Sequence, residues 1–147
     1  MIQVYTDGGF RGGRAGWGFI ALSPAGEVVY TNAGELTAPP LTSQRAELYA
    51  AVAALVEIPH LETLEIVSDS QYLVKGMNDW VYNWSMNGWR TSQRRPVENR
   101  DLWERLLNLT GGRTSTKWRW IGRSSVVWNT QVDALVQEVL CTPLRKS

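Results

Sequence analysis

The chain contains few of the residues that form covalent cross-links or soft-metal sites. Its 147 residues include one cysteine, Cys141, and one histidine, His60. A single cysteine excludes an internal disulfide framework and a cysteine-based zinc site, and it fits a reducing, cytoplasmic setting. No apolar run approaches the roughly 18 residues that a membrane helix needs, and the first residues lack a signal-peptide pattern. We therefore expect a single cytoplasmic domain over residues 1–147, with no membrane partner.

Charge is nearly balanced overall, but it is divided along the chain. The net charge is +1, yet residues 1–74 hold three basic and eight acidic side chains, whereas residues 75–147 hold twelve basic and six acidic ones. An acidic half beside a basic half is the arrangement expected for metal-assisted chemistry on a polyanion. Chance segregation of surface charge would give the same pattern, so the asymmetry alone decides nothing.

Tryptophan is in excess. Eight are present, and four of them, Trp80, Trp84, Trp89 and Trp103, fall within one stretch of 24 residues. Interleaved with arginines, these rings suit stacking on nucleic acid. The four-residue spacing of Trp80 and Trp84, however, puts both on one helix face and favours a core position for most of the tryptophans.

Hydrophobic periodicity predicts an α/β domain. Strands over residues 2–7, 16–22 and 27–30, with glycine-rich turns between them, form an antiparallel meander. A helix over 43–57 then leads to a strand over 63–68, which must lie parallel to the first because a helix connects them. The other expected elements are helices over 69–78, 100–109 and 129–141, a strand over 116–121, and a basic protrusion over about 80–100.

Four acids stand in apolar surroundings: Asp7, Glu47, Asp69 and Asp133. An ionised carboxylate is costly to bury unless positive charge meets it. Asp7 lies near the end of the first strand and Asp69 just past the fourth, so parallel pairing brings both to one sheet edge. Glu47 begins the intervening helix, and Asp133 lies in the last one. Each acid also has an individual explanation, such as helix capping by Asp69 or pairing of Glu47 with Arg45.

Convergence of the four carboxylates would create a site for hard cations. Oxygen ligands without histidine or cysteine select Mg²⁺ or Mn²⁺. Four carboxylates are enough to hold two such ions roughly 3.5–4 Å apart, and such a pair can activate water for phosphodiester cleavage. A separate structural reason for each of the four acids is less plausible than one common metal site.

The motifs around these acids resemble the type 1 ribonuclease H family. The matching segments follow the family's order and approximate spacing over nearly the whole chain. They are Tyr5–Gly9, Gly16–Gly18, Gln44–Leu48, Ser68–Tyr72, Asn83–Trp84, Gly88–Trp89, Arg95–Val97, Asp101–Trp103, Lys117–Trp120 and Asp133–Leu135. The resemblance implies a ribonuclease H-like fold: a five-stranded mixed sheet, three antiparallel strands followed by parallel strands, flanked by helices.

The resemblance also implies an activity and a cofactor. The expected reaction is endonucleolytic cleavage of the RNA strand of RNA–DNA hybrids, with 5′-phosphate products. The implied metal ligands for two Mg²⁺ ions, with Mn²⁺ as a substitute, are Asp7, Glu47, Asp69 and Asp133. A monomer without an obligate protein partner is the default expectation.

Contacts to the hybrid follow from the same resemblance. Residues 80–100 look like the basic protrusion with which bacterial members hold the DNA strand. The implied nucleic-acid contacts are Gly8, Gly9, Ser43, Gln44, Gln71, Trp84, Trp89, Arg90, Arg94 and Arg95.

Two departures from the family pattern stand out. The family often places a histidine in the loop before the last acid, where this chain has Arg123; His60 is expected on the surface, far from the site. Arginine does not titrate near neutrality, so we expect Arg123 to support turnover electrostatically, by holding a phosphate. The glycine loop after Asp7, residues 10–15, is shortened and lacks the usual Asn-Pro pair.

Two other classes of protein are alternatives to a nuclease specific for hybrids. A non-catalytic hybrid-binding module would gain nothing from crowded carboxylates beside a polyanion. An integrase or resolvase of the same fold usually carries additional DNA-binding segments, for which the chain has no room. The tail after Cys141 is expected to be mobile.

Overall fold

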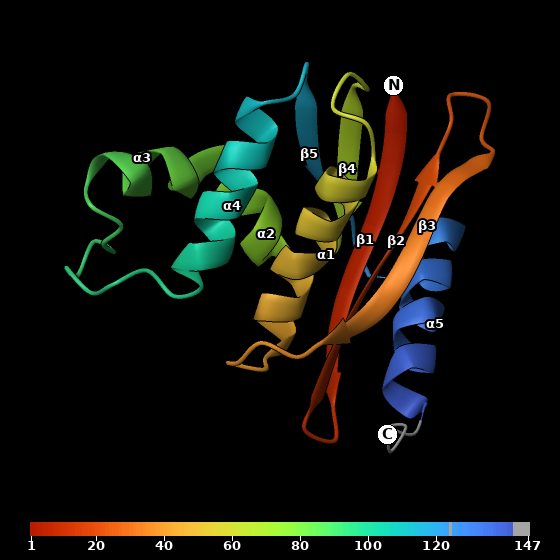
Figure 1. Ribbon diagram of the computed structural model, residues 1–147, viewed down its shortest axis with the longest axis horizontal. Helices are drawn as coiled ribbons and strands as arrows, with labels where there is room; N and C mark the ends of the chain where they lie inside the picture. The colour runs from red at the N-terminus through yellow and green to blue at the C-terminus, as the bar shows by residue number, and fades with distance from the viewer. Residues whose placement is uncertain (124, 143–147) are drawn as a thin grey trace.

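A five-stranded mixed sheet forms the centre of the computed structural model, which describes residues 1–123 and 125–142 (Figure 1). The strand order is β3-β2-β1-β4-β5. The strands are β1 Ile2–Arg11, β2 Arg14–Leu22, β3 Val28–Leu36, β4 Leu64–Ser68 and β5 Thr116–Trp120. The helices are α1 Ser43–Glu57, α2 Gln71–Lys75, the π-helical turn η1 Gly76–Trp80, α3 Val81–Met86, α4 Arg100–Gly111 and α5 Val127–Cys141.

The predicted fold class is confirmed. Strands β1, β2 and β3 pair antiparallel, whereas β4 pairs parallel with both β1 and β5. The parallel pairs follow helical connections, as the chain geometry requires. The expected tail lies in residues 143–147, outside the described residues.

The predicted end of the first strand is wrong. The strand does not stop at residue 7 but continues through Gly8 and Gly9 to Arg11, which pairs with Arg14. The turn consists of Gly12 and Gly13 alone, with φ of +59° and +78°. Two positive φ angles in a two-residue hairpin match the right-handed twist of the strands, so the ladder runs to the tip.

Two further predicted boundaries are wrong. Strand β3 is longer than the predicted 27–30, because its pairing with β2 continues to Leu36. The expected helix over 69–78 is broken, because η1 follows α2 directly. The Trp103 indole packs so closely on Gly76 that a side chain there would overlap it. Packing of Trp103 therefore accompanies the change in helical pitch.

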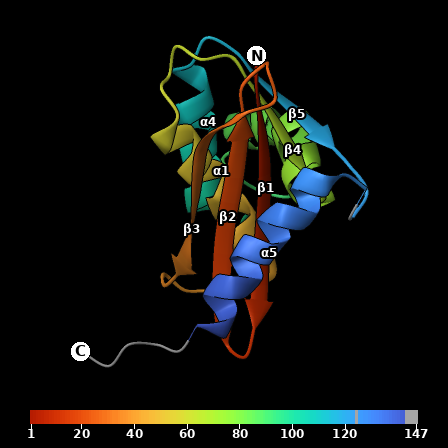
Figure 2. The same ribbon diagram turned by 90° about the vertical axis from the view of Figure 1, so that its right-hand side faces the viewer.

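Helices cover the two faces of the sheet unequally. The main core lies between the sheet and α1, α2 and α4, and includes Val4, Leu48, Ile66 and Trp103. Helix α5 covers the opposite face, where it crosses β1 and β2 (Figure 2). Among the described helices, none combines the length and the apolar character that a membrane span requires.

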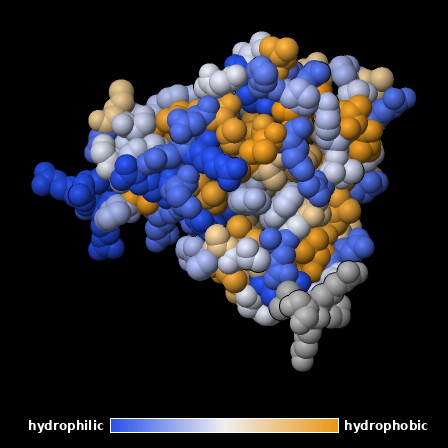
Figure 3. All heavy atoms as spheres, in the orientation of Figure 1, coloured by the Kyte–Doolittle hydropathy of each residue, from blue (hydrophilic) through white to orange (hydrophobic). Residues whose placement is uncertain are grey.

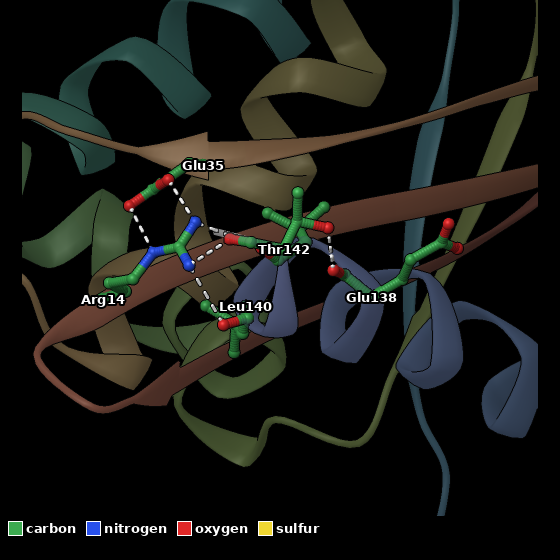
Figure 4. A network of polar contacts seen from close by, with 6 residues as sticks. Arg14, Glu35, Glu138, Leu140 and Thr142 are labelled. Carbon is green, nitrogen blue, oxygen red and sulfur yellow. Dashed lines mark hydrogen bonds and ion pairs between the residues drawn. The ribbon is translucent and has the colours of Figure 1, made fainter. Parts of the chain in front are cut away.

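Arg14 fixes the C-terminal end of α5 to the sheet (Figure 4). Its guanidinium donates two hydrogen bonds to the Glu35 carboxylate, at 3.0 and 2.7 Å. It also donates to the carbonyl oxygens of Val139, Leu140 and Thr142, at 3.2, 3.2 and 2.6 Å. A cation at a helix C-terminus satisfies carbonyls that have no partner within the helix and interacts favourably with the helix dipole.

Gly8 lets α1 approach β1 more closely than any other residue would allow. A Cβ atom at this position would overlap the backbone of Ala46 and Glu47. The missing side chain therefore sets the distance between the strand that carries Asp7 and the helix that carries Glu47.

We predict that Gly8→Ala destabilises the fold by about 1–3 kcal/mol, because the helix must move away from the strand. Urea unfolding measures this change. Gly111→Ala is the matched control, since a Cβ there meets nothing within 4 Å. Equal denaturation midpoints for Gly8→Ala and wild type would contradict the packing argument.

Candidate metal and active site

The four predicted carboxylates converge on one cavity, which lies beside the second half of β1 and the carboxyl end of β4. The cavity has a volume of about 500 Å³. Asp7 comes from β1, Glu47 from α1, Asp69 from the residue after β4, and Asp133 from α5. Four different elements thus bring acids that are distant in sequence to one place, as the parallel pairing of β1 and β4 predicts.

Three of the carboxylates form a tight cluster. Oxygen atoms of Asp7, Glu47 and Asp69 lie within 4.8 Å of one another. Asp133 lies outside this group but close enough for its side chain to act on the pKa of Asp7. It is exposed, on the side of the cavity formed by α5.

Burial and like charge raise the pKa values of the clustered acids. Burial, followed by the interaction with the Asp133 side chain, to which the protonated Asp7 can donate, and by the charges of Asp69 and Asp133, raises the pKa of Asp7 to about 8. Burial, with the charges of Asp7 and Asp69, holds the pKa of Glu47 well above its usual value. Burial also raises the pKa of Asp69, while the Arg123 charge opposes that increase. Without compensating positive charge, the cluster resists full ionisation.

The donor set fits a hard divalent cation. Every candidate ligand is a carboxylate oxygen, the type preferred by Mg²⁺ and Mn²⁺. Among the described residues, no hydrogen-bond donor reaches the buried Glu47 Oε2. A buried oxygen without a partner is expensive, and a bound cation would satisfy it. Asp7, Glu47 and Asp69 could therefore hold a metal ion, with Asp133 beside them.

Five predicted nucleic-acid contacts line the same cavity as the acids: Gly8, Gly9, Ser43, Gln44 and Gln71. Local capping explains why the polar side chains lie there. The Thr42 hydroxyl accepts from Arg45 N at 3.1 Å and starts α1 just before Ser43. The Ser70 hydroxyl accepts from Leu73 N at 3.1 Å and starts α2 at Gln71. Arg123 lines the cavity as well and is exposed.

The basic protrusion forms a second surface, whose groove meets the acid cavity at Tyr72. Hydrophilic residues cover the part of the molecule that extends beside α3, at the left of the space-filling view (Figure 3). Trp84 and Arg95 line a groove of about 310 Å³ there, together with Tyr72 and Trp80. Arg90 and Arg94 are exposed, and Arg90 donates a hydrogen bond to the Arg94 carbonyl at 3.2 Å.

Trp89 does not join that groove. Its side chain is 8% exposed and belongs to the main core, with the Arg100 guanidinium 5.7 Å from its ring centre. Trp89 thus packs in the core, as expected for most of the tryptophans, and its contact with nucleic acid stays a prediction. Trp103 is fully buried, and its indole N–H donates to the Tyr72 hydroxyl at 3.2 Å. His60 is exposed and does not line the cavity.

Sequence reasoning missed several features around the cavity. Phe10, Ser70, Tyr72 and Gln137 also line it. Gln137 could have been found, because it stands four residues after Asp133 and so shares its helix face.

The suggested partner of Arg45 was wrong. Its buried guanidinium donates to both carboxylate oxygens of Asp101, at 2.8 and 2.7 Å, rather than to Glu47. The Arg45 guanidinium holds the pKa of Asp101 below its usual value. Glu47 is thus left without a cation from its own helix.

The sheet and the acid cluster together define an α/β domain of the ribonuclease H fold with a carboxylate site at the edge of its parallel strands. The family model for RNase H matches residues 1–140. Ribonuclease H of Stutzerimonas stutzeri is 37% identical over 137 residues, covering 91% of this chain and 87% of that protein. Ribonuclease H of Cereibacter sphaeroides is 38% identical over 143 residues, covering 92% of each. The chain belongs to the RNase H family, a family of nucleases.

Solved structures agree on the fold. The RNase H1 of the halophilic archaeon Halobacterium salinarum superposes with a TM-score of 0.73 at 24% identity, covering 95% of this chain and 96% of that one. LC11-RNase H1, solved in complex with an RNA/DNA hybrid, gives a TM-score of 0.72 at 21% identity, covering 94% and 95%.

The raised pKa of Asp7 predicts how stability depends on pH in the absence of metal. The folded protein keeps the Asp7 proton up to about pH 8, whereas the unfolded chain loses it near the ordinary value of 3.8. The stability contributed by this group is complete below pH 3.8 and is lost as pH rises through 8. At pH 8 in EDTA, Asp7→Asn should therefore exceed wild type in unfolding free energy by at least about 2 kcal/mol, since one pKa unit corresponds to about 1.4 kcal/mol.

Urea unfolding in EDTA at pH 5 and pH 8 measures this difference, with Glu27→Gln, an exposed acid outside the cavity, as control. Added Mg²⁺ should stabilise wild type more than Asp7→Asn, because only the native site binds the ion with a full set of charges. Parallel pH profiles for wild type and Asp7→Asn would contradict the prediction.

Proposed function

We propose that this chain is an endoribonuclease that hydrolyses the RNA strand of RNA–DNA hybrids. The observation that carries the proposal is the meeting of Asp7, Glu47 and Asp69 oxygens within 4.8 Å, in a chain of the RNase H family. One structural neighbour was solved with an RNA/DNA hybrid bound, which supports this choice of substrate. The cavity beside the acids is large enough to admit a phosphodiester and its flanking sugars.

Divalent cations are the proposed cofactor. Asp7, Glu47, Asp69 and Asp133 would hold two Mg²⁺ ions, and Mn²⁺ would substitute for them. When bound, such a pair supplies an activated water and stabilisation of the leaving oxygen, which gives 5′-phosphate products. The unpartnered Glu47 Oε2 and the raised carboxylate pKa values support this assignment, because both are relieved by positive charge.

The chain's own residues orient the substrate around the acids. Ser43, Gln44 and Gln71 present polar side chains at two helix starts inside the cavity, where they can hydrogen-bond 2′-hydroxyl groups. Gly8 and Gly9 have no side chains, so the RNA strand can approach their backbone closely. The second groove, lined by Trp84 and Arg95 with Arg90 and Arg94 beside it, offers aromatic and cationic contacts for the DNA strand. All these residues belong to one chain, so we infer that a monomer suffices.

Arg123 is proposed to hold a phosphate at the edge of the acid cluster. It lines the cavity, and its charge acts on Asp69. A guanidinium stays charged at every working pH and binds phosphate oxygens in a fork geometry. It would therefore attract the scissile or the departing 5′-phosphate without exchanging a proton.

The activity is tested with a labelled RNA–DNA hybrid, double-stranded RNA and double-stranded DNA, each with Mg²⁺, Mn²⁺ or EDTA. We expect cutting of the hybrid's RNA strand alone, only with metal, and a loss of at least about 100-fold in Asp69→Asn, because removing a metal ligand costs at least as much as removing its supporting partner. Glu27→Gln is the control that should keep full activity. Cutting in EDTA, or equal cutting of the three duplexes, would overturn the proposal.

We expect Arg123→Ala to lower kcat by roughly 3- to 30-fold, about 1–2 kcal/mol for a lost charge-assisted contact. No limb of the pH–rate profile should disappear, because arginine does not titrate, but the acidic limb should move to higher pH, because the Arg123 charge no longer lowers the pKa of Asp69. Arg123→Lys should recover part of the rate. Full kcat across pH in Arg123→Ala, or the loss of one limb of the pH–rate profile, would show that the proposed role is wrong.

A further inference from the structure

The β1–β2 hairpin carries an aromatic side chain to the cavity. Phe10 is 48% exposed, although it stands on a central strand, and it lines the same cavity as Asp7 and Gln44. Hydrophobic burial in this fold does not account for it, because none of the described core clusters includes it.

The hairpin holds Phe10 rigidly. Phe10 pairs with Ala15, and the next pair, Arg11 with Arg14, closes directly on the two-glycine turn. Strands paired up to the tip leave little freedom for the residue next to it. The shortened loop is therefore a fixed support and not a flexible flap.

The ring lies on the α1 side of the sheet. Neighbouring residues of a strand face opposite sides. A Cβ at Gly9 would contact Val136 of α5 at 3.3 Å, which places Phe10 on the opposite face, the side of Gly8 and α1. The adjacent cation does not share this position, since Arg11 donates to Cys141 Sγ at 3.4 Å, at the end of α5.

We propose that Phe10 packs against a sugar of the strand that is cut and so fixes how the RNA strand sits over the acids. This inference rests on the proposed function. A half-exposed aromatic ring cannot bind phosphate, but it gains free energy by covering the apolar face of a ribose. The wide, shallow minor groove of an A-form-like duplex exposes its sugars to such a contact.

Strand geometry sets the position of the contact. Phe10 stands three residues beyond Asp7, about 10 Å along an extended strand. One nucleic-acid strand advances by about 3.4 Å per nucleotide, so the contacted sugar lies within about three nucleotides of the phosphate that is cleaved. The contact is close enough to the cleaved phosphate to affect how the RNA strand is positioned over the acids. It is too far from that phosphate to take part in the chemistry.

The test compares Phe10→Ala, Phe10→Leu and Phe10→Tyr in hybrid cleavage and in hybrid binding measured by fluorescence anisotropy in EDTA. We expect Phe10→Ala to raise KM and the hybrid Kd by about 3- to 15-fold, with kcat within a factor of two, because burying the exposed half of the ring is worth about 1 kcal/mol. Phe10→Tyr should retain wild-type values, and Phe10→Leu should recover only part of them.

Val28→Ala is the matched control. Val28 is 47% exposed on β3 and does not line the cavity, so its truncation should change neither KM nor Kd. Thermal unfolding of each variant checks that the fold is intact.

A scan of single 2′-O-methyl ribonucleotides locates the contact. Wild type should lose affinity at each position whose 2′-hydroxyl is contacted. At one of these positions, within about three nucleotides of the cut, Phe10→Ala should lose less than wild type, which is the coupling expected of two groups in contact. Three results would each overturn the inference: unchanged KM and Kd in Phe10→Ala, reduced kcat at constant KM, or no position coupled to Phe10. In each case the proposed function still stands if wild type cleaves the hybrid. A wild type that neither binds nor cuts hybrids would instead overturn the function itself.

Discussion

Mutual repulsion between carboxylates is the constraint on which the rest of the structure depends. Carboxylate oxygens of Asp7, Glu47 and Asp69 lie within 4.8 Å of one another in a partly buried cavity. Such crowding of like charges is unfavourable and would not persist in an isolated peptide. The fold provides the compensating energy elsewhere, in two hydrophobic cores on opposite faces of the sheet. The acid cluster thus lowers the stability of the fold, and the same cluster binds cations strongly; such a trade-off is common at functional sites.

To form the cluster, α1 must lie close to β1, and Glu47 must face Asp7 without a cation of its own helix beside it. Gly8 supplies the approach, because it lets the backbone of α1 lie against β1 and so brings Glu47 to Asp7. The bidentate pair of Arg45 with Asp101 ties the same helix to α4 and keeps that guanidinium away from Glu47. If Arg45 instead neutralised Glu47, the cavity would lose much of its affinity for a metal ion.

The sequence predicted those features that depend on local pattern and on topology. Alternation and helical spacing placed the strands and helices, and the parallel pairing of β1 with β4 brought Asp7 and Asp69 together as expected. Features that depend on three-dimensional contact were not predictable. Whether Trp89 is buried or exposed, and whether Arg45 meets Glu47 or Asp101, is decided by residues more than ten positions away. Gly8 was read as part of a turn because a strand glycine and a turn glycine look alike in sequence.

Among the described residues, side-chain hydrogen bonds to free backbone groups hold helix α5 at its C-terminal end only. Arg14 binds three carbonyls of its last turn, whereas the residue at its start, Val126, offers no side-chain bond to the first free N–H groups. Local opening must therefore be easier at the start of the helix than at its end, so amide hydrogen exchange should be graded along α5. Asp133 sits in the second turn, near the looser end, while the other three acids lie on or beside well-packed strands and α1. The burial of Val132, directly before Asp133, is therefore the contact that keeps the fourth carboxylate beside the cluster when the first turn of α5 opens.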